Sequence, residues 1–564
     1  MNVEQTLALY RDGVAAWNAW ASVLLEERTR LKENNQWTSD TRLDWHERAA
    51  ADFSGLSFQE PADFAGYCFP ARADFSGATF ENRVSFEKAT FSEATHLSNT
   101  PRKHTDDTPS ALAQLLHEVT FDRCCFRDSV SFARVRFANV VSFCETEFHG
   151  RLLFQVTAFL SDVYFVNTRF HASSHFEHVR FDEGLSVFEG ATFATTASFD
   201  DCSFHGDTWF SETIFSGPVA FLNVRFEALL TTFRDAEFHE RATFRKTVFR
   251  GQALFSRAQS AKSILFLGSD FENPAGFDAV DFSGRTVFNT VKFSAAARFD
   301  AGNFTGRTVF QNAMFSGVAD FSAIRATGHF SLSDVTFTYV PDFSQAHFES
   351  PLGFDWLGMK PPRSWAAGLD PEASVVARWR ALKSLAIQGC DYERELQFFR
   401  GELRARRGRE DPVTGAFFWI GWMYEILSDF GLSVSRPLAL LVASLVAFGT
   451  IHAKQSPYLW SEVAFSLAFG TRSAEVCNPG ASAAVLSLDA AFPFLGISGE
   501  AASSAQDCLY SQEYLAISLD ERPAGRSDKR VPTKLALVEV TQFFVSSTLL
   551  FLVLLAIRNR FRVS

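Results

Sequence analysis

The stretch DFSGATFENRVSFEKATF, residues 74–91, places phenylalanine at positions 75, 80, 86 and 91, in steps of five, six and five residues. At about 100° per residue, such steps would scatter the rings around an α-helix instead of aligning them. Thr, Val, Ser, Gly and Asp stand between the rings, and these residues favour strands and turns. The stretch therefore predicts short extended segments, each centred on one phenylalanine ring.

The same spacing continues along much of the chain, which has 63 Phe among its 564 residues but only 9 Tyr and 11 Trp. One series of rings extends from Phe53 to Phe91 and a second from Phe121 to Phe354, with a polar interruption near 98–120. The spacing also continues through three positions that lack a ring, Ser260, Ala326 and Leu332. A bias this strong toward one residue type indicates internal repeats.

Each repeat has a small or β-branched side chain two residues before its ring, such as Ala73 before Phe75 or Val130 before Phe132. Positions two apart share one face of an extended chain, so both side chains point inward. In a four-sided coil of about 22 residues, each five-residue side lies on another five-residue side and each six-residue side on another six-residue side. The rings of successive coils would then be ~4.8 Å apart. We expect about 10 to 11 coils between residues 121 and 354. The rings expected in this core include Phe75, Phe80, Phe86, Phe91, Phe132, Phe137, Phe143 and Phe148.

The motif ADFSGATF and its repetitions resemble the pentapeptide-repeat family, over residues 52–97 and 119–355. The resemblance implies a mainly β protein whose solenoid is a right-handed quadrilateral β-helix spanning residues 51–355. The segment GVAAWNAW, residues 13–20, is similar to the short helix that precedes the repeats in bacterial members, which implies an N-terminal helical cap over residues 1–50. Fold alone does not imply function.

Residues 356–411 predict a helical hairpin linker, with helices over 371–388 and 391–407 divided at Gly389. The second helix ends in a cluster of basic residues. This patch comprises Arg404, Arg406, Arg407 and Arg409. It is either a solvated helix face or a patch held against anionic lipid.

The remainder of the chain has the composition of a membrane domain. Within residues 412–434, the aromatic segment 416–427 predicts a helix at the bilayer interface. Within 435–564, segments 437–453 and 535–557 predict two spans joined by an external loop, 454–534. Arginines precede the first span and follow the second, so we expect a multi-pass protein of the plasma (inner) membrane. Its N-terminal solenoid and its C-terminus would both be cytoplasmic.

The second span carries Glu539, Gln542 and Ser546 on one helix face. These side chains either face a pore in an oligomer or, for Glu539, lie in the headgroup zone without a special role. The loop segments 458–470 and 483–496 are too short to span, and each is either a re-entrant half-helix or part of a packed external cap. Cys477 and Cys508, the two cysteines in the external loop, form a plausible disulfide.

No motif for an enzyme, a cofactor or a metal site stands out, and His171, His175 and His178 are expected on the solenoid surface. The net charge of −12 argues against a nucleic-acid partner. The family also includes acidic DNA mimics that protect gyrase, but interleaved residues such as Arg83 and Lys88 make this a poor match here.

We therefore expect a homo-oligomeric membrane protein with a channel-like pore domain and a cytoplasmic regulatory or interaction domain. Its layout is similar to the simplest potassium-channel-like modules, although a TVGYG filter is absent from the sequence. The alternative is a membrane-tethered scaffold without conductance. In both cases lipid is a partner, and the solenoid surface is free to bind a protein.

Overall fold

The computed structural model describes residues 1–91, 119–354, 358–359, 375–407, 410–454, 479–495, 499–518 and 533–563. These residues form two compact units, Met1–Gly389 and Cys390–Ser564. The boundary falls inside the segment 356–411 that the sequence predicts as one linker. Each unit is described by itself.

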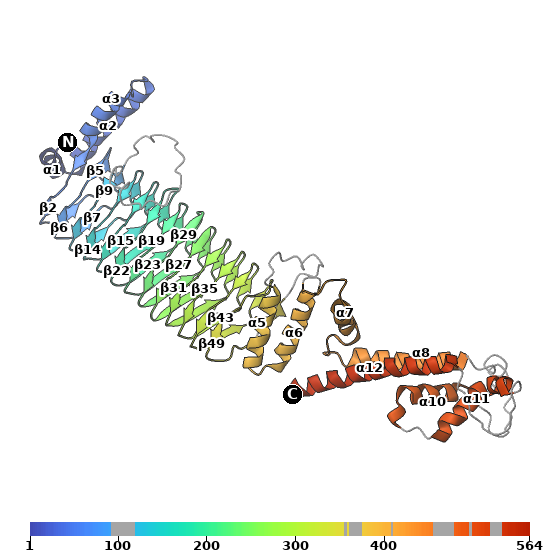
Figure 1. The fold of residues 1–564 in the computed structure, drawn as a ribbon. Helices are drawn as coiled ribbons and strands as arrows, with labels where there is room; N and C mark the ends of the chain where they lie inside the picture. The colour runs from blue at the N-terminus through green and yellow to red at the C-terminus, as the bar shows by residue number, and fades with distance from the viewer. Residues whose placement is uncertain are drawn as a thin grey trace, which may run out of the picture. The chain divides into compact units, whose positions relative to one another are not determined.

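Three helices cap the first coil of the solenoid, α1 (Val3–Arg11), α2 (Val14–Glu33) and α3 (Ser39–Ala49) (Figure 1). Trp17 of α2 is fully buried and stacks on the ring of Phe53 at 5.8 Å. Its indole Nε1 donates to the carbonyl oxygen of Cys68 at 2.9 Å, and Asn18 accepts from the Cys68 amide at the same distance. The helices thus satisfy backbone groups and cover rings that the first coil would otherwise expose.

The solenoid consists of four parallel sheets with 12, 13, 12 and 13 strands (Figure 1). The first coil contributes β1 (Ala51–Asp52), β2 (Ser57–Phe58), β3 (Ala62–Asp63) and β4 (Cys68–Phe69), and later coils repeat this order. The sheets end at β45 (Ala319–Asp320), β49 (His347–Phe348), β47 (Phe330–Ser333) and β50 (Gly358–Met359). The predicted four-sided solenoid is confirmed, with about 12 coils in all.

Phenylalanine rings stack along the inside of each sheet at the predicted spacing. Phe53 lies 4.8 Å from Phe75, with their planes 3° apart, and Phe121 lies 4.8 Å from Phe143. Phe75 and Phe121 also stack, at 4.9 Å, although the interruption near 98–120 separates them in the chain. The insertion therefore leaves the register of the coils unchanged. All eight rings expected in the core are at most 1% exposed.

The small inward position two residues before each ring has a second role that the sequence pattern does not show. Its hydroxyl or thiol donates to the carbonyl oxygen of a core phenylalanine about one coil earlier. Thr168 Oγ1 donates to Phe143 at 2.6 Å, and Cys124 Sγ donates to Phe75 at 2.7 Å. Each of these two carbonyl oxygens also accepts from a backbone amide three residues later in the chain, so the side chain supplies a second hydrogen bond.

One of the missing rings is replaced from another inward position. Ala326 pairs in register with Phe304 on one side and with Phe348 on the other. The ring of Phe330, four residues further along the chain, lies 5.8 Å from Phe304 and 5.4 Å from Phe348. Phe330 therefore occupies the space that a ring at position 326 would fill.

The last helix of the first unit, α5 (Val375–Gln388), packs on the final coils. Its Arg378 is 4% exposed and pairs with Asp342 at 3.4 Å. The first residues of the helix predicted over 371–388, residues 371–374, lie outside the described residues.

The second unit is helical. It contains α6 (Tyr392–Arg406), α7 (Ala416–Ser428), α8 (Ser435–Lys454), α10 (Pro479–Ala491), the 3₁₀ turn η2 (Pro493–Leu495), α11 (Gly499–Ser518) and α12 (Thr533–Val563). The predicted spans 437–453 and 535–557 fall within α8 and α12. Helix α10 packs against both of them and against α11 (Figure 1). It covers most of the predicted loop segment 483–496, whereas segment 458–470 lies outside the described residues.

Candidate functional site in the C-terminal helices

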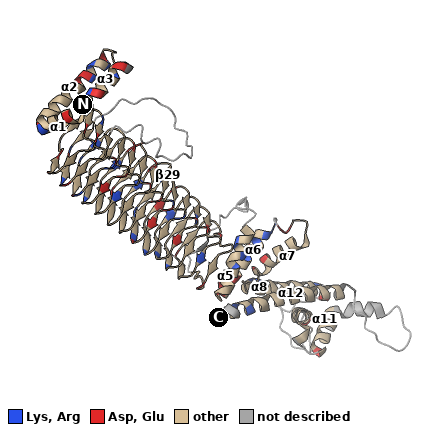
Figure 2. Ribbon diagram, turned by 60° about the vertical axis from the view of Figure 1, so that its left-hand side comes forward, with Lys and Arg blue, Asp and Glu red and all other residues tan. Residues whose placement is uncertain are grey.

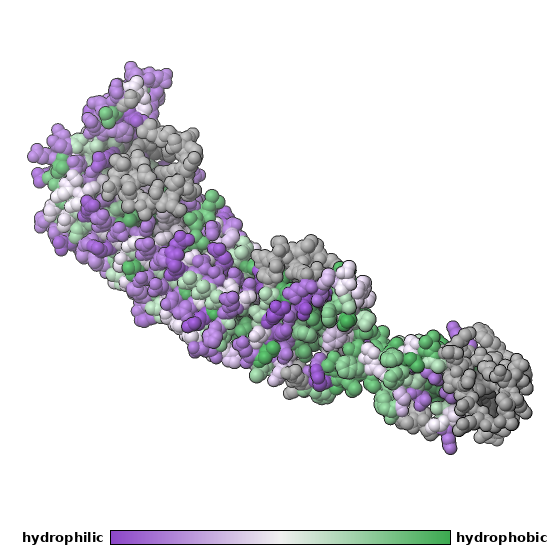
Figure 3. Space-filling model, in the orientation of Figure 1, coloured by the Kyte–Doolittle hydropathy of each residue, from purple (hydrophilic) through white to green (hydrophobic). Residues whose placement is uncertain are grey.

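Helices α8 and α12 are long and apolar enough to cross a membrane. The core helix of a soluble protein would be mostly buried, but only 17% of the most apolar stretch of α8 and 33% of that of α12 are buried. Large apolar side chains such as Val446, Phe544 and Phe551 point away from the unit. Figure 3 shows apolar surface gathered over these helices. The two helices are therefore candidate membrane spans, and the multi-pass topology stays a prediction.

The two apolar helices run antiparallel, and a polar contact fixes one end of the pair. Asn559 near the end of α12 donates through Nδ2 to the carbonyl oxygen of Gly431, just before α8, at 3.2 Å. Gly431 has a φ of +78°, and a Cβ there would lie 2.8 Å from the hydroxyl of Tyr424. This close approach requires glycine. Arg436 and Arg558 consequently lie near the same end of the helix pair.

A buried polar cluster joins α8, α10 and α12 near the middle of the helices. Gln542 on α12 is fully buried, and its Nε2 donates to the backbone oxygen of Ser487 at 2.7 Å and to its Oγ at 2.6 Å. Ser487 belongs to α10 and donates from Oγ to the carbonyl oxygen of Leu445 on α8 at 2.9 Å. His452 of α8 is also fully buried and hydrogen-bonds the Gln542 side chain. One serine thus connects all three helices.

The three polar residues predicted on one face of α12 lie toward other helices of the same chain. Gln542 and Ser546 are fully buried. Glu539 is partly exposed, has Gln506 of α11 as a hydrogen-bond partner, and interacts with the Asp489 carboxylate of α10. The pore-facing role predicted for these three residues stays a prediction, and the sequence did not single out Ser487. In the sequence, Ser487 is simply a serine within the apolar segment 483–496.

The predicted basic patch is largely paired with acidic residues of its own unit. Arg404 and Arg407 contact Glu425 of α7 at 2.8 and 2.7 Å, and Arg406 contacts Glu410 at 3.0 Å. Arg409 lies outside the described residues. These pairs attach α6 to one side of α7, and the lipid-facing role of the patch stays a prediction.

Helix α7 also carries exposed aromatic side chains. Phe417 is 76% exposed, and Trp419 and Trp422 are about half exposed. A short apolar helix with exposed Trp and Phe, ion-paired to its own unit through Glu425, has the character expected at a bilayer interface. This arrangement is consistent with the predicted interfacial helix.

The described cysteines have different surroundings, and the predicted pairing of Cys477 with Cys508 stays a prediction. Cys508 in α11 is disulfide-bonded, while Cys477, its predicted partner, lies outside the described residues. Cys124 and Cys202 fill the solenoid core. Burial raises the pKa of the Cys202 thiol to about 12. The surface histidines His171, His175 and His178 are all at least partly exposed, on the outside of the coils.

Charges of both signs alternate over the solenoid surface (Figure 2). Arg123 pairs with Glu145 in the next coil at 3.0 Å, and Arg127 pairs with Glu81 at 3.0 Å. Within the described coils, such pairs interrupt a continuous acidic stripe of the kind a DNA mimic needs.

Comparison with known protein families agrees with the architecture. Residues 165–259 match, in three overlapping segments, the family model described as pentapeptide repeats (9 copies). Comparisons with curated proteins and with solved structures found no match. The matched segment lies in the middle of the solenoid, and the coils before and after it have the same four-sided arrangement. The part of the solenoid over residues 165–259 is therefore built of pentapeptide repeats.

Proposed function

We propose that this protein is an oligomeric membrane protein in which α8, α10 and α12 of several copies together form a channel-like pore. The observation that carries the proposal is the placement of α10. Its 13 residues would extend about 20 Å, too short to cross a hydrocarbon core of about 30 Å. Yet α10 packs against both candidate spans and is held there by the hydrogen bonds of Ser487. A short helix supported by two long ones is the layout of a two-span pore module.

The charges near the helix ends support an orientation. Arg436, Arg558 and Arg560 lie near the same end of the α8–α12 pair, the end to which α7 is also connected. By the positive-inside rule this end is cytoplasmic, so the chain before α7, including the solenoid, is cytoplasmic as well. The solenoid then serves as a regulatory or partner-binding domain.

The acidic residues of the helical unit favour cations. Glu539 and Asp489 are close enough for their carboxylates to interact, and they lie on α12 and α10. Repeated around an oligomer, two carboxylates per chain would concentrate cations at one level of the pore. Several copies are required, because one pair of spanning helices cannot enclose a pore. Gln542 and Ser546 are buried between helices of a single chain, so the pore would be lined by other residues.

The test uses the purified full-length protein. Its mass in detergent is measured by light scattering, and the same preparation is recorded in planar bilayers. We expect an oligomer with discrete conductance steps, and Glu539→Gln should lower the cation-to-anion permeability ratio. The matched control is Glu500→Gln, which removes an exposed carboxylate from α11 and should leave the ratio unchanged. A monomer without conductance would contradict the proposal.

A second candidate is a membrane-tethered scaffold, in which α8 and α12 only anchor the solenoid. It is favoured by the burial of Gln542 and Ser546 within one chain, since the outward surface left on α12 is then mostly apolar. This candidate predicts a protein that resists extraction by alkaline carbonate but conducts no ions. The recordings above separate the two.

A further inference from the structure

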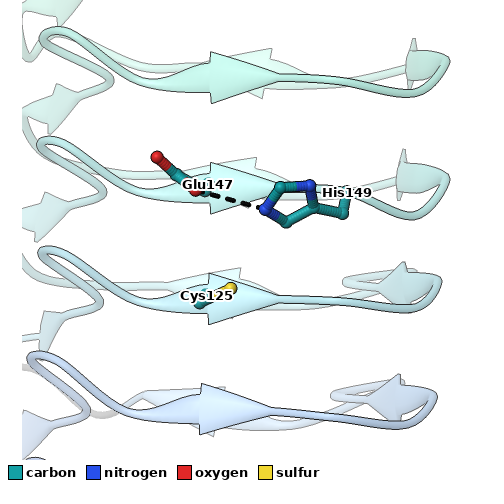
Figure 4. A group of neighbouring side chains, drawn as sticks. All are labelled: Cys125, Glu147 and His149. Atoms are coloured by element: carbon teal, nitrogen blue, oxygen red, sulfur yellow. Dashed lines mark hydrogen bonds and ion pairs between the residues drawn. The ribbon is translucent and has the colours of Figure 1, made fainter.

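A cysteine, a glutamate and a histidine meet on the outer surface of the solenoid, far along the chain from the helical unit. Cys125 belongs to β10 (Cys125–Phe126), and Glu147 belongs to β14 (Glu147–Phe148). The two strands are neighbours in one sheet, and Cys125 pairs in register with Glu147. Because Phe126 and Phe148 point into the core, Cys125 and Glu147 point outward, and so does His149 (Figure 4).

The three side chains offer ligand atoms that lie within 4.8 Å of one another. His149 Nε2 and Glu147 Oε2 are 3.1 Å apart. In a tetrahedral zinc site with bonds of 2.0–2.3 Å, ligand atoms are about 3.5 Å apart. Small side-chain rotations suffice to reach this separation, since the backbone already places the three residues on adjacent coils.

Neighbouring residues orient two of these ligands. Arg169 in the following coil holds the other carboxylate oxygen of Glu147, Oε1, at 2.9 Å, which leaves Oε2 directed at His149. The ring of His171 stacks on that of His149 at 4.3 Å, with the planes 4° apart. The carboxylate and the imidazole are therefore restrained in orientation before any ion binds.

The donor set matches a borderline divalent ion. A thiolate and an imidazole favour Zn²⁺ over hard cations such as Mg²⁺ and Ca²⁺, which prefer oxygen ligands. One thiolate and one carboxylate would also balance the two positive charges of the ion. Arg123 and Arg127, each two residues from Cys125, are paired with Glu145 and Glu81 at 3.0 Å and are thus partly neutralised.

We propose that Cys125, Glu147 and His149 form a Zn²⁺ site that connects two adjacent coils, with water as the fourth ligand. On binding, the Cys125 thiol loses its proton to solvent, and the neutral imidazole of His149 coordinates through Nε2. The hydrogen bond between His149 and Glu147 is replaced by bonds from both residues to the ion. This site is independent of the function proposed for the C-terminal helices.

The test uses metal-free full-length protein and Co²⁺ as a spectroscopic substitute for Zn²⁺. We expect one tightly bound Co²⁺ per chain, with a thiolate-to-cobalt charge-transfer band and the intense visible bands of tetrahedral cobalt. Zn²⁺ should displace it. Cys125→Ser should abolish the charge-transfer band, and His149→Ala should weaken Zn²⁺ binding by at least about tenfold in calorimetry.

The matched control is Cys68→Ser, because Cys68 also lies outward, directly before a core ring, on a different sheet. It should retain the band and the affinity. Unchanged far-ultraviolet circular dichroism of Cys125→Ser would show that the solenoid is intact. Absence of a thiolate band in the parent protein, its persistence in Cys125→Ser, or its loss in Cys68→Ser would each overturn the proposal.

Discussion

The replacement of one core ring by another allows a direct test of how the solenoid is packed. Phe330 is 2% exposed and contacts the two rings, Phe304 and Phe348, that flank Ala326 in their sheet. A phenylalanine buries about 150–250 Å², so at about 25 cal/mol per Å² its loss should cost about 4 kcal/mol. Phe330→Ala is therefore expected to destabilise the last coils strongly.

The reciprocal change should restore the packing. Ala326→Phe alone adds a ring where Phe330 already lies, and overpacking of this kind costs about 1–3 kcal/mol. In the double variant, the new ring at position 326 can stack directly between Phe304 and Phe348. We expect its stability to lie within about 1.5 kcal/mol of the parent protein, well below the sum of the two single losses.

Hydrogen exchange followed by mass spectrometry measures these changes coil by coil in the full-length protein. Phe330→Ala should accelerate exchange in peptides from residues 304–348 by about three orders of magnitude, which corresponds to about 4 kcal/mol. Peptides from residues 132–181 are an internal control and should be unaffected, since repeats interact mainly with their neighbours. If the double variant exchanges as fast as Phe330→Ala, the explanation of the missing ring is wrong.

Three further predictions concern other parts of the chain. Gly306→Ala should destabilise the solenoid by more than about 2 kcal/mol. The added Cβ would lie 2.1 Å from a carbonyl oxygen of the preceding coil and would clash with its backbone. Gly77→Ala, with φ of +68° and open space around it, should cost only about 1 kcal/mol by the same exchange measurement. Burial raises the pKa of Cys202 to about 12 from 9.0, so ionisation favours the unfolded chain as the pH rises above 9. The free energy of unfolding of the parent protein should therefore fall between pH 8 and pH 10 by about 1.4 kcal/mol more than that of Cys202→Thr. Denaturant titrations of both proteins at the two pH values measure this difference. Gln542→Leu should leave Ser487 without its donor partner and lower the thermal stability of the helical unit in detergent, whereas the solenoid transition should stay unchanged.

The solenoid could be predicted almost completely from the sequence, because each repeat carries its own signal. A ring every five or six residues and a small residue two positions earlier define the strand, the inward face and the length of the coil. The replacement of Ala326 by Phe330 could not be predicted in this way. The spacing shows where a ring is missing, but the side chain that fills the space comes from a different inward position on the adjacent side.

The helical unit was predictable only in part. The apolar segments of α8 and α12 and the common face of Gln542 and Ser546 follow from periodicity along a single helix. Periodicity does not show which segment covers that face, because α10 is too short to be recognised as a membrane span. Likewise, the arginines of α6 were visible as a cluster, but their partner Glu425 lies on another helix, and only the fold brings them together.

Phenylalanine is used in opposite ways in the two units, and this contrast constrains any account of function. In the solenoid the stacked rings are almost completely buried, whereas Phe544, Phe551 and Phe561 of α12 are 64%, 63% and 75% exposed. In water, a surface of this kind would be driven to bury itself, and soluble monomers seldom present so large an apolar area. Gln542 and Ser546 of α12 are instead buried, and Gln542 contacts α10 and α8. A helix that buries Gln542 and Ser546 and leaves large apolar rings exposed is matched to an apolar environment, which lipid or neighbouring copies would supply. The solenoid needs no such environment, because its rings are already buried inside its own coils.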